Sequence, residues 1–205
     1  MLSGVAKFIY FSTFQVYGNA DDLSGLIAEE TAPNPSNVYA QTKLAAEKYL
    51  NELSENGMQG IILRLSNAVG APADFEVAQS VWDLAFNAFV IQGLKQGVIR
   101  PNSFASRDFI GMNSVLDVLD VVLKSDFDSN CETYNLGGGK TISIVELAQN
   151  ISQVMKNVEV VVPRGSASST FAYSINKIEQ LGCNIKLNLA SEIEQCVKVI
   201  KLSDK

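Results

Sequence analysis

The sequence of 205 residues contains no histidine. Histidine is the general base of Ser-His-Asp and Cys-His catalytic sites and the commonest zinc ligand, so its absence excludes these mechanisms and most zinc sites. Cysteine is also scarce, and Cys131, Cys183 and Cys196 follow no disulfide or metal-binding spacing. Such cysteines are typical of reduced, buried thiols in a cytoplasmic protein.

Positive charge is scarce as well, because 16 Lys and Arg residues stand against 22 Asp and Glu residues and give a net charge of −6. This balance argues against a nucleic-acid-binding surface, and an anionic substrate would need a local group of arginines. No apolar run is long enough to span a membrane, and no signal peptide precedes the first expected strand. With 47% hydrophobic residues the chain can bury a core. We therefore expect a globular cytoplasmic protein with neither nucleic acid nor membrane as a partner.

The sequence contains instead the parts of a proton-transfer site. An apolar run at residues 7–12 predicts a buried strand, after which Thr13 presents a hydroxyl. A helix is expected over residues 37–55, and on it Tyr39 and Lys43 are four residues apart and share one face. The Lys43 ammonium would favour the phenolate of Tyr39, and the Thr13 hydroxyl could bind a substrate oxygen while Tyr39 gives or takes its proton. Each piece alone is common on solvated helices and at strand ends, so the prediction depends on their order.

Apolar and polar segments alternate along the chain in a way that favours an α/β fold. A second short apolar run, residues 61–65, follows the helix at 37–55 and predicts another buried strand. Strand, helix and strand in this order form a βαβ unit, so the sheet should be parallel. Further helices are expected at residues 77–95, 115–125, 143–156, 174–181 and 189–202, and further strands at 132–136 and 158–162. Residues 97–101 are expected to form a short strand or a turn.

The order of the motifs resembles the extended branch of the short-chain dehydrogenase/reductase superfamily, the nucleotide-sugar epimerases and dehydratases. The S-S/T-x-x-V-Y-G motif of that branch is similar to residues 12–18, and its Y-x-x-x-K motif to Tyr39 and Lys43. The resemblance extends over almost the whole chain. Further similar segments are L-R-x-x-N at 63–67, R-D-F/Y-I/V at 107–110 and Y-N-x-G-x-G at 134–139.

The resemblance implies a nucleotide-sugar enzyme that uses NAD rather than NADP, and no metal. In the family the asparagine of L-R-x-x-N contacts the sugar nucleotide, and the arginine of R-D-F/Y-I/V approaches the diphosphate, which its planar fork can hold. The implied residues are Thr13, Tyr39 and Lys43 for catalysis, Ser12, Leu65 and Ser66 with Tyr39 and Lys43 for the cofactor, and Asn67, Arg107 and Arg164 with Thr13 for the substrate.

Two positions depart from the family pattern. The family has an aspartate seven residues after the R-D-F arginine, where it caps the next helix, and Ser114 stands there in this chain. Since serine also caps helices, we expect it to cap the helix at 115–125. Arg164 is similar to the arginine of the family's R-P-G-D phosphate contact, but Pro163 precedes it and Ser166 replaces the aspartate.

A Gly-x-x-Gly-x-x-Gly turn after the first strand, which holds the cofactor pyrophosphate in this family, is missing from the sequence. The resemblance therefore implies the C-terminal part of a Rossmann-type parallel sheet, with a small α/β substrate-binding domain. A sheet cut between strands leaves an apolar edge, so we expect a homodimer or pairing with a chain that supplies the N-terminal half. The expected domains are a partial dinucleotide-binding domain, residues 1–70 and 108–139, and a substrate-binding domain, residues 71–107 and 140–205.

The implied activity is epimerisation of an NDP-hexose, at C4, through a 4-keto intermediate. Dehydratases of the family carry T-D-E at the first motif, whereas Phe14 and Gln15 follow Thr13 here, which disfavours dehydration. Two alternatives stay open. A 4-ketoreductase would need the same three catalytic residues, and the missing cofactor half would also fit a non-catalytic remnant or one half of a split enzyme.

Overall fold

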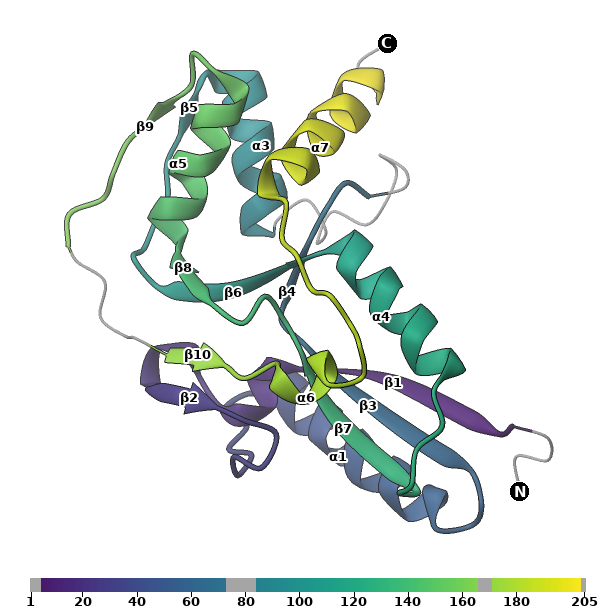
Figure 1. Ribbon diagram of the computed structural model, residues 1–205. Helices are drawn as coiled ribbons and strands as arrows, with labels where there is room; N and C mark the ends of the chain where they lie inside the picture. The colour runs from purple at the N-terminus through teal and green to yellow at the C-terminus, as the bar shows by residue number, and fades with distance from the viewer. Residues whose placement is uncertain (1–4, 73–83, 166–170, 204–205) are drawn as a thin grey trace.

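The computed structural model describes residues 5–72, 84–165 and 171–203. Figure 1 shows two parts: a sheet with its helices below, and a group of helices with short strands above. The polypeptide passes between the two parts several times, so neither part is one continuous stretch of sequence. In the described residues no helix is long and apolar enough to cross a membrane.

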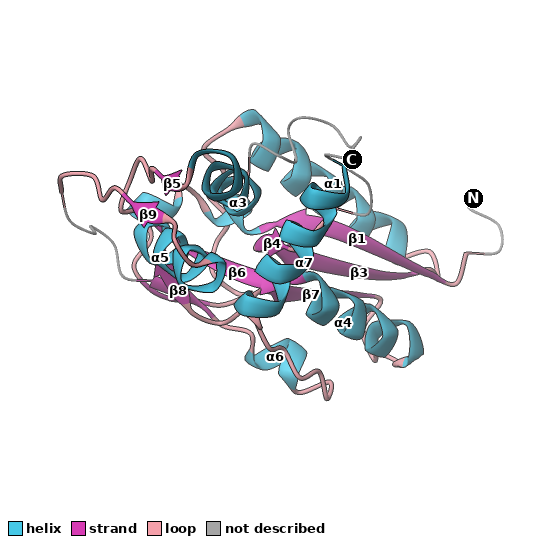
Figure 2. Ribbon diagram, turned by 90° about the horizontal axis from the view of Figure 1, so that it is seen from above, coloured by secondary structure: helices cyan, strands magenta, loops and turns pink. Residues whose placement is uncertain are grey.

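The lower part is the parallel sheet that the strand-helix-strand pattern predicts. Its main elements are β1 (Lys7–Thr13), β3 (Gln59–Leu65), β7 (Cys131–Leu136), α1 (Val38–Ser54) and α4 (Met112–Lys124). The strands pair in the order β1-β3-β7 and are all parallel, which confirms the prediction. Side chains of β3 alternate between the two faces, so Ile61 and Leu63 pack in the same cluster as α4, and Ile62 packs with α1. Figure 2 shows the sheet between these two helices.

Polar groups fix both of these helices at their ends. The Asn37 side chain caps the start of α1, where its Oδ1 accepts a hydrogen bond of 2.9 Å from the Ala40 amide. At the other face of the sheet, the Lys7 ammonium of β1 donates to the carbonyls of Val122 (2.9 Å) and Ser125 (2.6 Å) at the end of α4. A cation is favourable there because the last carbonyls of a helix carry partial negative charge.

The upper part is built on three helices around a second apolar core. Its elements are α3 (Ala85–Gln96), α5 (Ile144–Met155), α7 (Leu189–Ser203), β4 (Asn67–Val69), β6 (Ser106–Gly111), β8 (Thr141–Ser143), β5 (Val98–Ile99) and β9 (Glu159–Val160). Val90, Leu147 and Ile193, one from each helix, are fully buried in this core. α5 begins at the predicted capping box, in which the side chains of Ser143 and Glu146 each accept a hydrogen bond from the other residue's amide.

Short elements close the fold between the two parts. They are the 3-10 helices η1 (Phe14–Tyr17) and η2 (Ala20–Asp22), the parallel pair β2 (Gly25–Ile27) and β10 (Phe171–Tyr173), and the helix α6 (Asn176–Glu179). They enclose an aromatic cluster in which the rings of Phe14 and Tyr173 are stacked with centroids 3.7 Å apart.

Some expected elements differ from those in the structure. α3 overlaps the predicted helix at 77–95 and ends one residue beyond it, at Gln96, whereas residues 77–83 lie outside the described residues. The expected cap at Ser114 is wrong: α4 begins earlier, after Gly111, and Ser114 lies buried inside the helix. Its hydroxyl instead exchanges hydrogen bonds with the backbone of Lys186, which fastens α4 to the segment before α7.

Candidate active site

A cavity of about 500 Å³ opens where β1 and β3 end. Thr13 and Leu65, the last residues of these strands, line it together with Tyr39 from the first turn of α1 and Arg107 from β6. Open α/β sheets bind ligands at the carboxyl ends of their strands, so this position is the expected one for a site. The cavity lies between the two parts of the fold and is lined by residues from both parts.

Thr13 and Tyr39 line the cavity, whereas Lys43, one helical turn beyond Tyr39, is not among the described residues that line it. The Thr13 hydroxyl is nearly buried and accepts a hydrogen bond of 3.3 Å from the Gln15 amide. Tyr39 is half exposed at 51%, and its ring is 5.8 Å from the Lys43 ammonium. Lys43 is held by the strand, because its Nζ donates to the carbonyl of Phe11 at 2.7 Å. A phenol that faces the cavity next to a tethered ammonium is suited to proton transfer.

Ser12, the neighbour of Thr13, is engaged on the other side of the strand. Its hydroxyl donates to the carboxylate of Glu47, which also receives hydrogen bonds of 3.1 Å and 2.8 Å from Nε and Nη2 of Arg64. All three residues are buried. The side chain of Ser12, for which sequence analysis expected a cofactor contact, therefore belongs to this core network and not to the cavity lining.

The network continues toward β7 through Tyr17. Arg64 Nη1 donates to the Tyr17 hydroxyl at 2.9 Å, and this hydroxyl donates to Asn135 Oδ1 at 2.6 Å. Burial raises the pKa of Tyr17 to about 12, although the Arg64 guanidinium acts in the opposite direction. Tyr17 is therefore a neutral structural phenol at ordinary pH.

Ser66, Asn67 and Arg107 line the side of the cavity that β6 and the end of β3 form. Asn67 Nδ2 donates to the carbonyl of Asp108 at 2.8 Å, which turns its side chain along the strand. Arg107 Nη1 contacts Asp21 of η2 at 3.3 Å. Asn67 and Arg107 thus lie on one wall, as their positions after strand or loop ends suggest.

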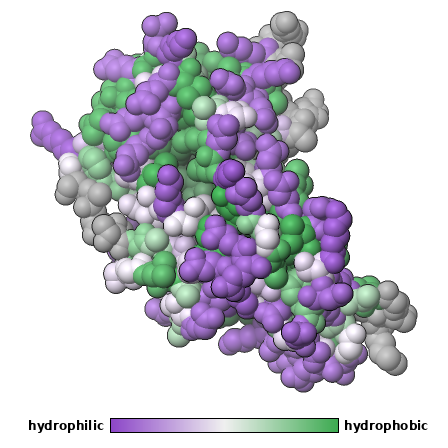
Figure 3. Space-filling view, viewed as in Figure 1, coloured by the Kyte–Doolittle hydropathy of each residue, from purple (hydrophilic) through white to green (hydrophobic). Residues whose placement is uncertain are grey.

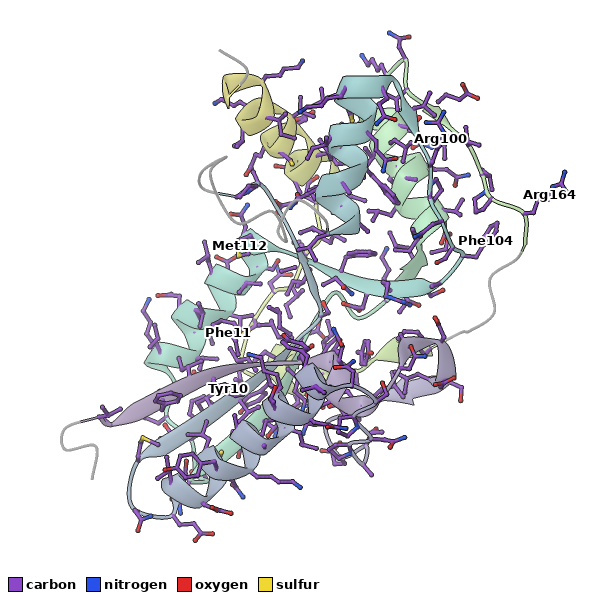
Figure 4. The ribbon with its side chains drawn as sticks, turned by 180° about the vertical axis from the view of Figure 1, so that it is seen from behind. Tyr10, Phe11, Arg100, Phe104, Met112 and Arg164 are labelled. Atoms are coloured by element: carbon purple, nitrogen blue, oxygen red, sulfur yellow. The ribbon has the colours of Figure 1, made fainter. Side chains whose placement is uncertain are left out.

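Arg164 lies apart from these residues. It is exposed, it is not among the described residues that line the cavity, and in Figure 4 its side chain points away from the body of the molecule. Tyr10 and Phe11, labelled in the same view, lie on β1, far from Arg164. The structure therefore does not bring Arg164 together with the other expected substrate-binding residues.

Sequence reasoning missed Asp108. This residue is 1% exposed, and its Oδ1 accepts a hydrogen bond of 2.7 Å from the Gly138 amide. Burial raises the pKa of Asp108 to about 6, against the influence of the amides of the glycine turn. Its Oδ2 has no hydrogen-bond partner among the described residues, and Ser66 lies beside it without completing a hydrogen bond of ordinary geometry. The R-D-F motif contains this aspartate, but its contact with a glycine turn thirty residues further on is not visible in the sequence.

An aromatic wall was also not foreseen. Phe14, Phe171 and Tyr173 line the cavity, and the rings of Phe171 and Tyr173 meet edge to face with centroids 5.3 Å apart. These residues come from η1 and β10, far apart in sequence, so only the fold brings them together. They give the cavity one apolar face opposite its polar residues.

Comparison with known proteins identifies the family. Residues 2–137 match the model of the NAD dependent epimerase/dehydratase family, and these residues make up more than half of the chain. The chain belongs to this family. As a family member it has a Rossmann-type fold, and the resemblance drawn from its motifs is confirmed.

Two relatives show how the family member compares in sequence. It is 28% identical over 189 residues to UDP-glucose 4-epimerase 4 of Oryza sativa subsp. japonica, an alignment that covers 83% of this chain and 51% of that protein. It is 25% identical to the human dTDP-D-glucose 4,6-dehydratase, with 95% of this chain and 56% of that protein covered. The chain thus spans about half the length of the curated relatives it matches.

Solved structures agree on the fold. MoeE5 in complex with UDP-glucose and NAD superimposes with a TM-score of 0.79 at 19% identity, and covers 98% of this chain and 67% of that one. UDP-glucuronic acid 4-epimerase from Bacillus cereus in complex with NAD gives a TM-score of 0.77 at 24% identity, with 95% and 60% covered. At these identities the likeness establishes the fold of this family member.

Proposed function

We propose that this chain carries the catalytic and substrate-binding half of an NAD-dependent nucleotide-sugar epimerase that acts at C4 of an NDP-hexose. The observation that supports this most is the single cavity in which Thr13 and Tyr39 face Asn67 and Arg107, with Lys43 behind Tyr39. Membership of the epimerase/dehydratase family and the 4-epimerases among its relatives favour the same reaction.

The residues of the cavity have distinct roles in the proposed reaction. Tyr39 acts as a phenolate, the form that the Lys43 ammonium favours; it takes the proton of the sugar 4-hydroxyl, is a neutral phenol beside the 4-keto intermediate, and then returns the proton. The Thr13 hydroxyl donates to the oxygen at C4 and stabilises the 4-keto intermediate. When bound, NAD supplies the acceptor and then the donor of the hydride. We propose that Tyr39, Lys43, Leu65 and Ser66 would contact its nicotinamide side.

The opposite wall suits the rest of the substrate. Arg107 is the only lysine or arginine among the described residues that line the cavity, and its guanidinium can hold two diphosphate oxygens. Asn67 lies on the same wall, and the rings of Phe14 and Tyr173 offer an apolar surface to a sugar or base. The cavity therefore has a charged end, a hydroxyl-binding end and an apolar side.

Dehydration is less well supported by the acids of the cavity, although a dehydratase is among the relatives. Asp108 is the only carboxylic acid among the described lining residues, and a backbone amide of the glycine turn already holds one of its oxygens. Gln15, at a position where dehydratases carry an acid, accepts a hydrogen bond from the Asn37 side chain at 3.0 Å. Elimination would need an acid free to reach the sugar.

The remaining half of such an enzyme would be supplied through the edge of the sheet. β1 is one of the two outer strands of the sheet β1-β3-β7, and Phe8 on it is 42% exposed. On α4, Leu116 and Leu123 are 56% and 62% exposed, and Figure 3 shows hydrophobic side chains at the surface over this helix. An unpaired strand beside apolar side chains is suited to pairing with further polypeptide, which we propose carries the pyrophosphate-binding turn.

Two measurements on the full chain test the proposed function. Calorimetry with UDP-glucose should show binding, and NMR of the sugar anomeric protons should show UDP-galactose when NAD is added in large excess, to offset the weak NAD binding expected of a chain without the glycine turn. Tyr39→Phe should keep the binding but lower turnover by roughly 10²–10⁴-fold, the contribution of a general acid–base group. Tyr49→Phe is the matched control, since Tyr49 lies on the same helix, is 63% exposed and is not among the lining residues.

The outcomes separate the alternatives. Binding without turnover in the wild-type chain would favour one half of a split enzyme, whose activity then requires the cofactor-binding half. Reduction of an NDP-4-keto sugar with no epimerisation would favour a 4-ketoreductase. A chain that binds no UDP-glucose at all would overturn the proposed function.

A further inference from the structure

The one cation that lines the described cavity is already paired. Arg107 Nη1 contacts the carboxylate of Asp21 at 3.3 Å and also donates to the carbonyl of Ser106 at 2.8 Å. The Arg107 and Asp21 side chains are 31% and 48% exposed, so this ion pair lies at the mouth of the cavity in reach of solvent and ligands. Any anionic ligand that uses Arg107 must deal with this carboxylate.

Asp21 is presented by an anchored turn. Its amide donates to the side chain of Asn19, the cap of η2, at 3.4 Å. Ala20 and Leu23, on either side of the two aspartates, pack against the aromatic cluster of Phe14 and Tyr173. Asn19 and Ala20 themselves line the cavity. The turn therefore holds the Asp21 carboxylate at the rim, where it meets β6.

We propose that Asp21 is a built-in competitor for the diphosphate of the ligand at Arg107, and that it sets how tightly the site holds a nucleoside diphosphate. This rests on the proposed function, in which Arg107 binds that diphosphate. A carboxylate and a phosphate use the same N–H donors of a guanidinium, so the ligand either displaces Asp21 or binds beside its negative charge. Both routes weaken binding.

The same contact also favours release of the product. When the diphosphate leaves, Asp21 can return to Arg107, so the cation does not have to be exposed without a partner. The overall charge of −6 does not compensate for this competition, because it repels an anionic ligand as well. Asp21 thus keeps the affinity moderate for a ligand that must enter and leave in every cycle.

The test compares two adjacent aspartates. Asp21→Asn and Asp22→Asn each remove one negative charge from η2, but Asp22 makes no ion pair with Arg107 in the described structure. Calorimetry of the full chain with UDP should show binding about two- to fivefold tighter for Asp21→Asn, the range expected for an exposed ion pair. Asp22→Asn should change the affinity for UDP by less than about 1.5-fold, since a charge without a contact is largely screened.

A third variant asks whether the effect passes through Arg107. In an Arg107→Gln background, Asp21→Asn should change UDP affinity no more than Asp22→Asn does, because the pair is already broken. Equal gains for the two aspartate variants, or a gain for Asp21→Asn that persists without Arg107, would overturn the role of Asp21 and leave the proposed function intact. If no variant binds UDP, Asp21→Asn included, both proposals are overturned.

Discussion

Asp108 should make the stability of the protein depend on pH in an unusual direction. Most carboxylates gain partners on folding and stabilise a protein as pH rises. Asp108 is 1% exposed and its pKa is raised from 3.8 to about 6, mainly by burial. The folded protein therefore binds a proton more tightly at this site than the unfolded chain does. This contribution to stability is fully present below pH 3.8 and is lost as pH rises through 6.

The size of the effect follows from the two pKa values of Asp108. At about 1.4 kcal/mol per pKa unit, an interval from 3.8 to about 6 corresponds to roughly 3 kcal/mol across the whole transition. Between pH 5 and 7.5 the linkage relation gives a loss of about 1 kcal/mol in the free energy of unfolding. Because Asp108 is completely buried, no reduction for solvent screening is needed.

Asp108→Asn is the informative variant. The asparagine cannot ionise, yet its carbonyl oxygen can still accept the hydrogen bond from the Gly138 amide. Urea denaturation of both proteins at pH 5 and pH 7.5 gives four free energies of unfolding. Other carboxyl groups titrate in both proteins, so the difference between the two pH dependences isolates Asp108. We expect the wild type to lose about 1 kcal/mol more than the variant between these pH values.

The reasoning fails if the two proteins show the same pH dependence. That result would mean that the carboxylate keeps its ordinary pKa in the folded state, for example because a water molecule satisfies Oδ2. The variant could also show the expected smaller loss of unfolding free energy between pH 5 and 7.5 and yet be much less stable than the wild type at pH 5. That result would show that the asparagine disturbs the glycine turn. In that case Ser66→Ala, which leaves Asp108 and Gly138 unchanged, should raise the pKa of Asp108 further, because the Ser66 hydroxyl lowers it.

Two further predictions concern the core network and the cofactor. Glu47→Ala should lower the free energy of unfolding by roughly 3–5 kcal/mol, because it leaves the buried Arg64 guanidinium without its carboxylate, and urea denaturation would measure it; a loss below about 1 kcal/mol would contradict the network. The chain alone should bind NAD weakly, since its sequence has no Gly-x-x-Gly-x-x-Gly turn for the pyrophosphate. Calorimetry that finds micromolar NAD binding by a monomer would show that other residues replace this turn.

The main sheet could be predicted from the sequence because β1 and β3 are apolar runs and the connection between them is a long helix. An apolar run, a capped helix and a second apolar run leave a parallel βαβ unit as the simple solution. The short strands β4, β6 and β8 could not be predicted in this way. Three to six residues give too few periods for a pattern, and β6 contains the polar residues Arg107 and Asp108. Their pairing is decided by the neighbouring strands.

The candidate site could be predicted where the spacing along a helix fixes which side chains lie together. It could not be predicted where the answer depends on the direction of a side chain or on a partner far away in the sequence. Tyr39 and Lys43 share a helix face whatever surrounds them. Ser12 and Thr13 are neighbours on a strand, so their side chains point in opposite directions, and only one of them can face the cavity. The partner of Ser12, Glu47, lies thirty-five residues away, and no sequence rule identifies such a contact.

The position of Tyr39 follows from the rest of its helix. Lys43 and Glu47 follow Tyr39 at intervals of four, so the three side chains lie along one face of α1. Lys43 is tied to the backbone of β1, and Glu47 to Arg64 on β3. The two ties fix the rotation and height of the helix above both strands whose ends form the cavity. Tyr39 is half exposed in the first turn, and its hydroxyl makes no hydrogen bond within the described part of the chain. Its placement therefore depends on polar contacts one and two turns further along.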